Sequence, residues 1–422
     1  MYKSSLVLAA VLASITCAAS NDNDQAPISL TLSAAETLLV SQNRDLIASR
    51  RALDGVQADR LTADHRPNPA LSLSTLSINP RRAGTGPPWE KSADTALQIS
   101  QPIERGGKRE LRSAAADHNV QAASFDVDET RRQQRFLLRQ AYFDLRLAQE
   151  RVSISRETVM AFRRTLDAVN VRLKSGDIAS ADVSRISVDA LRSENDLRQN
   201  TADLERARVA LGYLIGLETR AASIEAIDPW PELAPMPEAP GNEVLDMRPD
   251  VRAAVERATA ALKAAQLAAA QRSRDVTVFA QFERFPGQVQ NNTIGFGISV
   301  PLFLNYSYEG EIRRAESDRY AAQDNLERVR ALARTEIARA RTGLASARDR
   351  VDRFDGQLLA FARKAAEAAE FAYKRGALGV MDLLDARRSL NATQLDAAAA
   401  HADHAKALAA WRAAGGDMVD ER

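Results

Sequence analysis

The sequence is short of cysteine, of unbalanced charge and of long apolar runs, and each shortage excludes a class of protein. Its only cysteine is Cys17, in a segment that we expect to be removed, so neither disulfides nor a cysteine metal site is expected. The 57 basic and 56 acidic side chains nearly cancel, which excludes a basic field for nucleic acid. After residue 20 no apolar run reaches the about 18 residues of a transmembrane helix, so no helix is expected to cross a bilayer.

The first residues have the order of a secretory signal. Lys3 precedes an apolar run from Leu6 to Ile15, and small residues follow at 17–20. We therefore expect residues 1–20 to be a signal peptide and the protein to leave the cytoplasm. Lipidation of Cys17 is an alternative, although the residues just before it match the usual lipidation context poorly.

The chain is a tandem duplication of one unit. A shift of 200 residues places Lys174 on Lys374, Gly176 on Gly376 and Asp182 on Asp382. We take 21–217 as the first repeat, 243–416 as the second and 417–422 as a C-terminal tail. The linker, 218–242, contains five prolines between positions 229 and 240, which exclude a continuous helix.

Each repeat is expected to contain a helix, a pair of strands and a long helical hairpin. The strands are expected at 70–78 and 94–102 in the first repeat, and at 275–283 and 293–302 in the second. The hairpins are expected to turn at 175–180 and 375–380, around a glycine. Prolines are absent between Pro102 and Pro229 and after Pro301, so each long helix can run for about 60 residues, or roughly 90 to 100 Å.

Apolar side chains in both hairpins recur at alternating spacings of three and four, which predicts coiled-coil packing. In the first repeat the series is Leu145, Ala148, Val152, Ser155, Val159, Phe162, Leu166, Val169 and Leu173, with Ser155 as its one polar member. In the second they are Val351, Phe354, Leu358, Phe361, Ala365, Ala368 and Ala372.

The strand segments alternate apolar and polar residues. Ile294, Phe296 and Ile298 share one face, and Gly295 and Gly297 share the other. About ten alternating residues suit a tilted strand that crosses a bilayer. A soluble sheet with one buried face has the same pattern, but at the end of such long hairpins it has no evident core to cover. Four strands cannot close a barrel, so the chain is expected to oligomerise.

These features resemble the TolC family of outer membrane efflux proteins over essentially the whole mature chain. The matching segments are Leu30–Ala35, Asn43–Leu46, Arg66–Pro69, Met247–Ala254 and Val300–Phe303. Ser100–Arg109, which contains Gly106-Gly107-Lys108-Arg109, resembles the CzcC-type branch that serves heavy-metal pumps of the resistance-nodulation-division class.

The resemblance implies a mainly α fold with a small membrane β part. Three chains would form a homotrimer whose twelve strands close one outer-membrane β-barrel and whose twelve helices continue as a periplasmic α-barrel. It implies a passive exit duct whose partners are a periplasmic adaptor (membrane fusion protein), an inner-membrane resistance-nodulation-division transporter and outer-membrane lipid. The CzcC-type branch implies heavy-metal cations as cargo.

The candidate entrance lies at the second hairpin. Asp382 and Asp385 follow Gly376 and share a helix face. In the TolC family this hairpin lines the periplasmic entrance, and acids at matching positions form a ring. The first repeat keeps Asp182, where helix capping is the simpler interpretation. The resemblance also places adaptor docking at the two tips, although only Gly176 and Gly376 match the family's docking pattern.

Other candidate sites are weaker. His401 and His404 have a spacing that can bind a metal, but two solvated histidines on an alanine-rich surface helix are the simpler explanation. Gly106-Gly107-Lys108 lacks the remaining residues of a phosphate-binding loop. We identify no nucleophile with its base, so we expect no enzyme activity and no cofactor.

Two alternatives remain at this stage. The same duct can serve a multidrug pump or a type I protein secretion system, because the inner-membrane partner selects the cargo. A periplasmic coiled-coil adaptor or spacer is the second alternative, but adaptors carry one hairpin and a lipoyl-like β domain, whereas this chain has two hairpins and amphipathic strand pairs.

Overall fold

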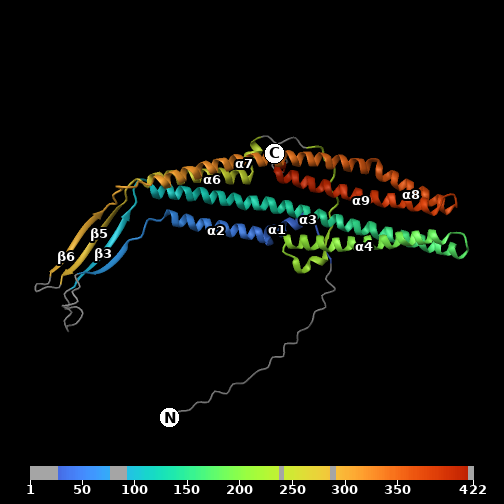
Figure 1. The fold of residues 1–422 in the computed structure, drawn as a ribbon, viewed down its shortest axis with the longest axis horizontal. Coiled ribbons are helices and arrows are strands. Elements are labelled where there is room, and N and C mark those ends of the chain that lie inside the picture. Colours follow the sequence, from blue (N-terminus) through green and yellow to red (C-terminus); the bar gives the residue numbers. More distant parts are fainter. Residues whose placement is uncertain (1–26, 77–92, 237–241, 286–290, 417–422) are drawn as a thin grey trace, which may run out of the picture.

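The computed structural model describes residues 27–76, 93–236, 242–285 and 291–416. The molecule is elongated, with a sheet at one end, two hairpin tips at the other and helices between them (Figure 1). The expected signal peptide at 1–20 and the tail at 417–422 lie outside the described residues, as do residues 77–78 and 237–241.

The elements follow the same order in both halves. The first half contains α1 (Leu32–Gln42), α2 (Arg44–Asp64), β2 (Ala70–Leu76), β3 (Asp94–Ile103), α3 (Lys108–Lys174) and α4 (Ser180–Leu214). The second contains α5 (Asn242–Met247), α6 (Pro249–Ala270), β5 (Val276–Phe285), β6 (Asn291–Ser299), α7 (Glu309–Arg353), α8 (Leu359–Lys374) and α9 (Val380–Trp411). Strand β6 ends earlier than expected, so Val300–Leu302 lie beyond it.

The two hairpins turn at glycines in the left-handed region. Gly176 has φ 80° and Gly376 has φ 74°. After α3 the amide of Asp177 donates to the carbonyl of Arg172 at 2.9 Å, and after α8 the amide of Ala377 donates to that of Ala372 at 2.9 Å. This six-to-one bond is the Schellman motif, in which glycine avoids the steric cost of positive φ.

Helix α3 is 67 residues long and most of its expected apolar stripe is buried, whereas Leu173 at its end is exposed. Leu145, Val152, Val159 and Val169 are almost fully removed from solvent. Burial of this stripe against α4 and the second hairpin stabilises a helix that is far longer than an isolated one could hold in water.

The stripe of the second hairpin is interrupted. A π-helical turn, Phe354–Leu358, separates α7 from α8, and the amide of Leu359 donates to the carbonyl of Phe354. The extra residue rotates the following stripe by about 100°. Val351 is therefore buried as expected, whereas Phe361 is 63% exposed and Ala366 faces the interior instead.

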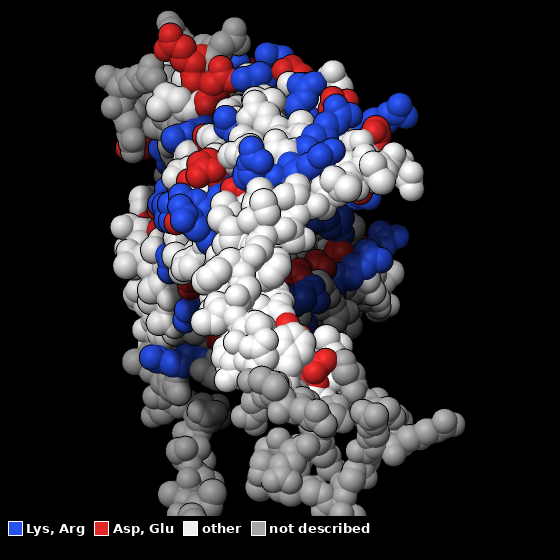
Figure 2. Space-filling model, turned by 90° about the vertical axis from the view of Figure 1, so that its left-hand side faces the viewer, with Lys and Arg blue, Asp and Glu red and all other residues white. Residues whose placement is uncertain are grey.

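In the described residues, β2, β3, β5 and β6 form one antiparallel sheet in the order β2-β3-β5-β6. Leu71, Ile99, Ala280 and Phe296 are register partners across it, and the exposed Leu71, Ile99 and Phe296 form its apolar face. Figure 2, which views the sheet end, shows a surface nearly free of charged side chains with basic side chains gathered beside it.

The opposite face of the sheet is mostly polar, with serine, threonine, glutamine and glycine, but it also carries an aromatic residue that we did not expect. Phe279 lies opposite Gly297, and a Cβ added at Gly297 would approach the Phe279 ring to 2.3 Å. Glycine at this position therefore allows the ring to cover the neighbouring backbone.

A belt near the middle of the molecule joins the start of the first repeat to the linker. Strands β1 (Ile28–Leu30) and β4 (Ile224–Ala226) pair in parallel. The hydroxyl of Tyr142 donates to the carbonyl of Leu30 at 2.9 Å and accepts from the amide of Asp228 at 3.1 Å. Burial raises the pKa of Tyr142 to about 12.

Helices of the described segments were also compared with the requirements of a membrane span. None of them combines the length with the mean hydropathy that a bilayer-crossing helix needs.

Candidate entrance at the hairpin tips

The two hairpin tips lie side by side because an apolar cluster joins them. It is formed by Phe162 and Val169 of α3, Ile186 and Ala190 of α4, and Val380 and Leu384 of α9. In Figure 1 both tips project at the end opposite the sheet. The structure therefore brings Gly176 and Asp182 of the first tip close to Gly376, Asp382 and Asp385 of the second.

The two candidate acids lie in the first turns of α9. Asp382 is exposed, and its helix begins after Gly379, which provides no side-chain cap. The side chain of Asp385 is 70% exposed and accepts a hydrogen bond from Arg388 at 2.7 Å. Both carboxylates are therefore open to solvent, and Arg388 offsets part of the charge of Asp385.

Asp182 has a different environment. It lies in the first turn of α4 and its carboxylate is 3.9 Å from Arg185 of the same helix. An acid in this position interacts favourably with the helix dipole.

Two arginines that the sequence did not single out join the hairpins. Arg387 donates to the carbonyl of Ala161 at 2.9 Å and to the hydroxyl of Thr165 at 2.6 Å, so it attaches α9 to α3. Arg388 contacts the buried carboxylate of Asp189 on α4. We call Arg387 and Arg388 the arginine latch.

Glu370 of α8 extends this network. It accepts from Lys374 at 2.8 Å and from Arg387 at 3.4 Å. The hydrogen bond from Lys374 and the nearby charge of Arg387 lower the pKa of Glu370. Glu370 and Arg387 also line a cleft of about 270 Å³ between the hairpins.

The candidate histidines lie far from the tips along α9. His401 contacts Asp355 at 3.2 Å and its ring stacks on Trp230. His404 is buried, and burial lowers its pKa, with a smaller contribution from His401. Among the described residues, no three metal-ligating side chains gather into a group that could hold a metal ion.

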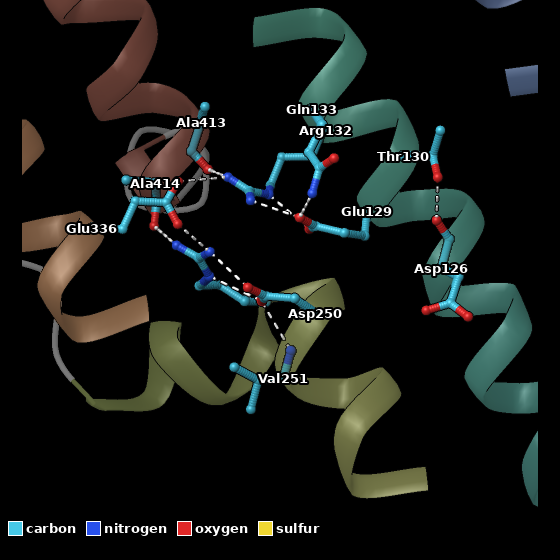
Figure 3. A network of polar contacts seen from close by, with 11 residues as sticks. Asp126, Glu129, Thr130, Arg132, Gln133, Asp250, Val251, Glu336, Ala413 and Ala414 are labelled. Carbon is cyan, nitrogen blue, oxygen red and sulfur yellow. Dashed lines mark hydrogen bonds and ion pairs between the residues drawn. The ribbon is translucent and has the colours of Figure 1, made fainter. Parts of the chain in front are cut away.

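A buried ionic cluster holds the end of the second repeat (Figure 3). Arg248, before α6, is completely buried and contacts Asp250 at 2.8 Å and Glu336 of α7 at 2.7 Å. It also donates to the carbonyl of Ala414 at 2.9 Å. Arg132 of α3 donates to the carbonyl of Ala413 at 2.7 Å, so the cluster joins both repeats.

The arrangement at the tips can attract cations and can hold the hairpins together, but it offers no reacting group. Hydrogen bonds from the arginine latch connect α9 with α3, α4 and α8, so a change in those bonds would alter the spacing of the tips. The signals for the latch were the Arg-Arg pair after Asp385 and an acid, Asp189, on an otherwise buried face.

The chain was compared with known proteins. The family model described as outer membrane efflux protein matches residues 37–217 and 241–417. Among curated proteins, the cobalt-zinc-cadmium resistance protein CzcC of Cupriavidus metallidurans is 28% identical over 365 residues, which cover 86% of this chain and 84% of that protein.

Solved structures give the same fold. The outer membrane protein VceC of Vibrio cholerae has a TM-score of 0.75 at 22% identity, with 91% of this chain and 96% of that chain covered. The CmeC outer membrane channel of Campylobacter jejuni has a TM-score of 0.78 at 17% identity, with 91% and 85% covered.

Proposed function

The chain belongs to the outer membrane efflux protein family, and from this premise we propose that it is the passive exit duct of a tripartite pump of the resistance-nodulation-division class. It is an outer-membrane protein with a helical extension into the periplasm. We further propose that its cargo is heavy-metal cations.

The main support for a duct is the position of the amphipathic sheet. Strands of about ten residues with an exposed apolar face stand at one end of helices about 100 Å long. Within the described part of one chain, β2 and β6 are the edges of this sheet. Unpaired edges are costly in lipid, so three copies that pair β6 with β2 of the next chain would close twelve strands.

The helices support the periplasmic half of the proposal. The two hairpins of one chain lie side by side, and three copies would surround an axis with twelve helices. The tips would then converge, so Asp382 and Asp385 would form a ring of six carboxylates at the entrance. A periplasmic adaptor would dock at the tips around Gly176 and Gly376 and would connect the duct to the inner-membrane transporter.

The cargo is supported by the similarity to a cobalt-zinc-cadmium resistance protein. The Gly106–Arg109 segment, which resembles that branch, agrees with it. The duct itself need select little, because a water-filled channel transmits what the inner-membrane transporter delivers.

Deletion of the gene tests this proposal. Growth should become more sensitive to zinc, cobalt or cadmium than to dyes and detergents, and cell-associated metal should rise. The same gene on a plasmid should restore both. If dyes and detergents are affected more strongly than the metals, the cargo assignment is wrong. If cross-linking of the purified protein stops at a dimer, the trimer is wrong.

A further inference from the structure

Basic residues gather where the strands of the first repeat meet the helices. Lys108 and Arg112 form ion pairs within the protein. Lys108 is buried and contacts Asp275 at 2.9 Å, and Arg112 contacts Glu104 at 2.7 Å. These pairs hold the turn at Gly106 and Gly107 between β3 and α3, where both glycines have positive φ.

Two other arginines of this junction are in contact with solvent. The side chain of Arg66 is exposed, and that of Arg109 is partly exposed and contacts the neighbouring Glu110 at 3.6 Å. Both line an open groove of about 830 Å³ between the end of α2 and the start of α3, together with Asp64, Gln101, Ile103 and Glu110. Glu104, which is paired with Arg112, also lines the groove, so two cationic side chains face three carboxylates there.

The groove continues the apolar face of the sheet. Ile103, which lines the groove, is exposed, as is Ile99 further along β3. Alternation along β3 places both on the same apolar face of the sheet as Leu97. An occupant with an ionic head and an apolar tail would place the head in the groove and the tail on this face.

The second repeat presents an aromatic segment at the same junction. Leu302 and Leu304 are exposed, Leu304 by 82%. Phe303 and Tyr308 pack edge to face, and the guanidinium of Arg274 lies 5.7 Å from the Phe303 ring. Aromatic and arginine side chains beside exposed leucines are typical of a membrane interface.

We propose that this junction binds phospholipid of the leaflet on the helical side of the sheet. Arg66 and Arg109 hold the phosphate by charge-assisted hydrogen bonds. Asp64 and Glu110 face the headgroup ammonium, which makes an ethanolamine headgroup the best match. The acyl chains lie on Ile99 and Ile103, and Leu302 and Leu304 enter the upper acyl region of the same leaflet.

The charges favour phospholipid over other occupants. A nucleic acid or an acidic peptide would meet the carboxylates Asp64 and Glu110 and has no apolar tail for the strand face. A second copy of the chain would need acidic partners for Arg66 and Arg109. This inference rests on the proposed location of the sheet in the outer membrane.

Lipid titration of the full mature protein, followed by native mass spectrometry, tests the site. Wild-type protein should bind phosphatidylethanolamine, and R66Q/R109Q should bind it roughly tenfold more weakly or worse, because two charge-assisted contacts are lost. R192Q/R198Q, which alters two exposed arginines of α4, should bind like wild type. D64N/E110Q should lose the preference for phosphatidylethanolamine over phosphatidylcholine.

A second measurement tests how deeply the aromatic segment enters the bilayer. A tryptophan at Leu304 should be quenched by phospholipid that is brominated near the glycerol more than by phospholipid brominated at the chain end. Equal affinity of wild type and R66Q/R109Q, or binding of lipid A in preference to phosphatidylethanolamine, would overturn the proposal. Outer-membrane fractionation and bilayer conductance of the same variants report the proposed function separately, and both should remain normal when lipid binding is lost.

Discussion

Asn43 and Arg248 occupy equivalent places in the two repeats, and each binds the carbonyl near the end of its own repeat's last helix. The side-chain amide of Asn43 donates to the carbonyl of Leu214 at 3.1 Å, and the guanidinium of Arg248 donates to the carbonyl of Ala414 at 2.9 Å. Asn43 also binds Gln134, whereas Arg248 binds Glu336. Both repeats thus keep a side chain that binds the end of the repeat's last helix. It is a neutral amide in the first repeat and a charged guanidinium in the second.

The ionic form should be the more sensitive to mutation. R248A leaves Asp250 without its arginine and leaves Glu336 with Arg132 alone, at 3.2 Å. We expect a loss of about 3 kcal/mol, at the low end for a broken buried pair, because Glu336 keeps Arg132 and some contact with water. N43A should cost about 1 to 2 kcal/mol, since it removes a cap and a buried hydrogen bond. Thermal unfolding of the purified protein in detergent measures both.

R330Q is the control for these variants. Arg330 forms a more exposed pair with Asp246 at 3.3 Å, and such pairs contribute about 0 to 1 kcal/mol. We expect the unfolding temperature to decrease in the order wild type, R330Q, N43A and R248A. A result in which R248A unfolds no earlier than R330Q would contradict a stabilising role of the cluster.

The sequence predicted the features that depend on local pattern. The positions of the hairpin turns followed from Gly176 and Gly376, and the strand faces followed from alternation such as Ile294, Phe296 and Ile298. The family resemblance was confirmed by the family model. Local pattern sufficed because glycine in a helix-ending turn and period-two alternation are each dictated by a few neighbouring residues.

The sequence did not predict features that depend on distant partners. The contact of Arg388 with Asp189 joins residues about 200 positions apart, and no periodicity connects them. The π-helical turn was missed because the apolar spacing continues through Phe354 and Leu358. Gly356, inside that helix, was the one local signal of an irregularity.

Phe279 and Gly297 make a test of sheet packing. G297A would force the Phe279 ring from its position and should cost about 1 to 3 kcal/mol, as expected for overpacking. G295A is the matched control, because nothing lies within 4 Å of an added Cβ there. The yield and unfolding temperature of the oligomer should fall for G297A alone.

The double variant F279A/G297A distinguishes a clash from a change in backbone freedom. Removing the ring should restore much of the yield that G297A loses. If F279A/G297A remains as poor as G297A, then glycine is required for its backbone and the ring contact is irrelevant.

His404 should make stability depend on pH. Burial, with smaller contributions from His401 and Arg348, lowers the pKa of His404 below 6.5 in the folded protein. The unfolded chain therefore binds more protons than the folded chain just below pH 6.5, so this contribution to stability is present above 6.5 and is lost as pH falls through the folded pKa.

The measurement is the unfolding temperature between pH 7.5 and pH 5. Wild type should lose stability on acidification, and H404Q should lose less. H65Q alters an exposed histidine and should follow the wild-type curve. Parallel curves for wild type and H404Q would show that His404 does not titrate in this range.

The entrance acids give the last prediction, because the structure provides variants that should act in opposite directions. Asp382 and Asp385 are exposed, and Arg388 offsets part of the charge of Asp385 and of Asp189. D382N/D385N keeps side-chain size and removes up to six charges from a trimer, so cation preference and block by multivalent cations should both decrease. R388Q leaves the acids and removes the neighbouring cation, so both properties should increase.

D182N serves as the control, since Asp182 is close to Arg185 on the first hairpin. Conductance and reversal potentials in planar bilayers measure these effects. If D382N/D385N and R388Q change cation preference in the same direction, the variants act through the spacing of the hairpins, because opposite changes in local charge cannot produce one sign.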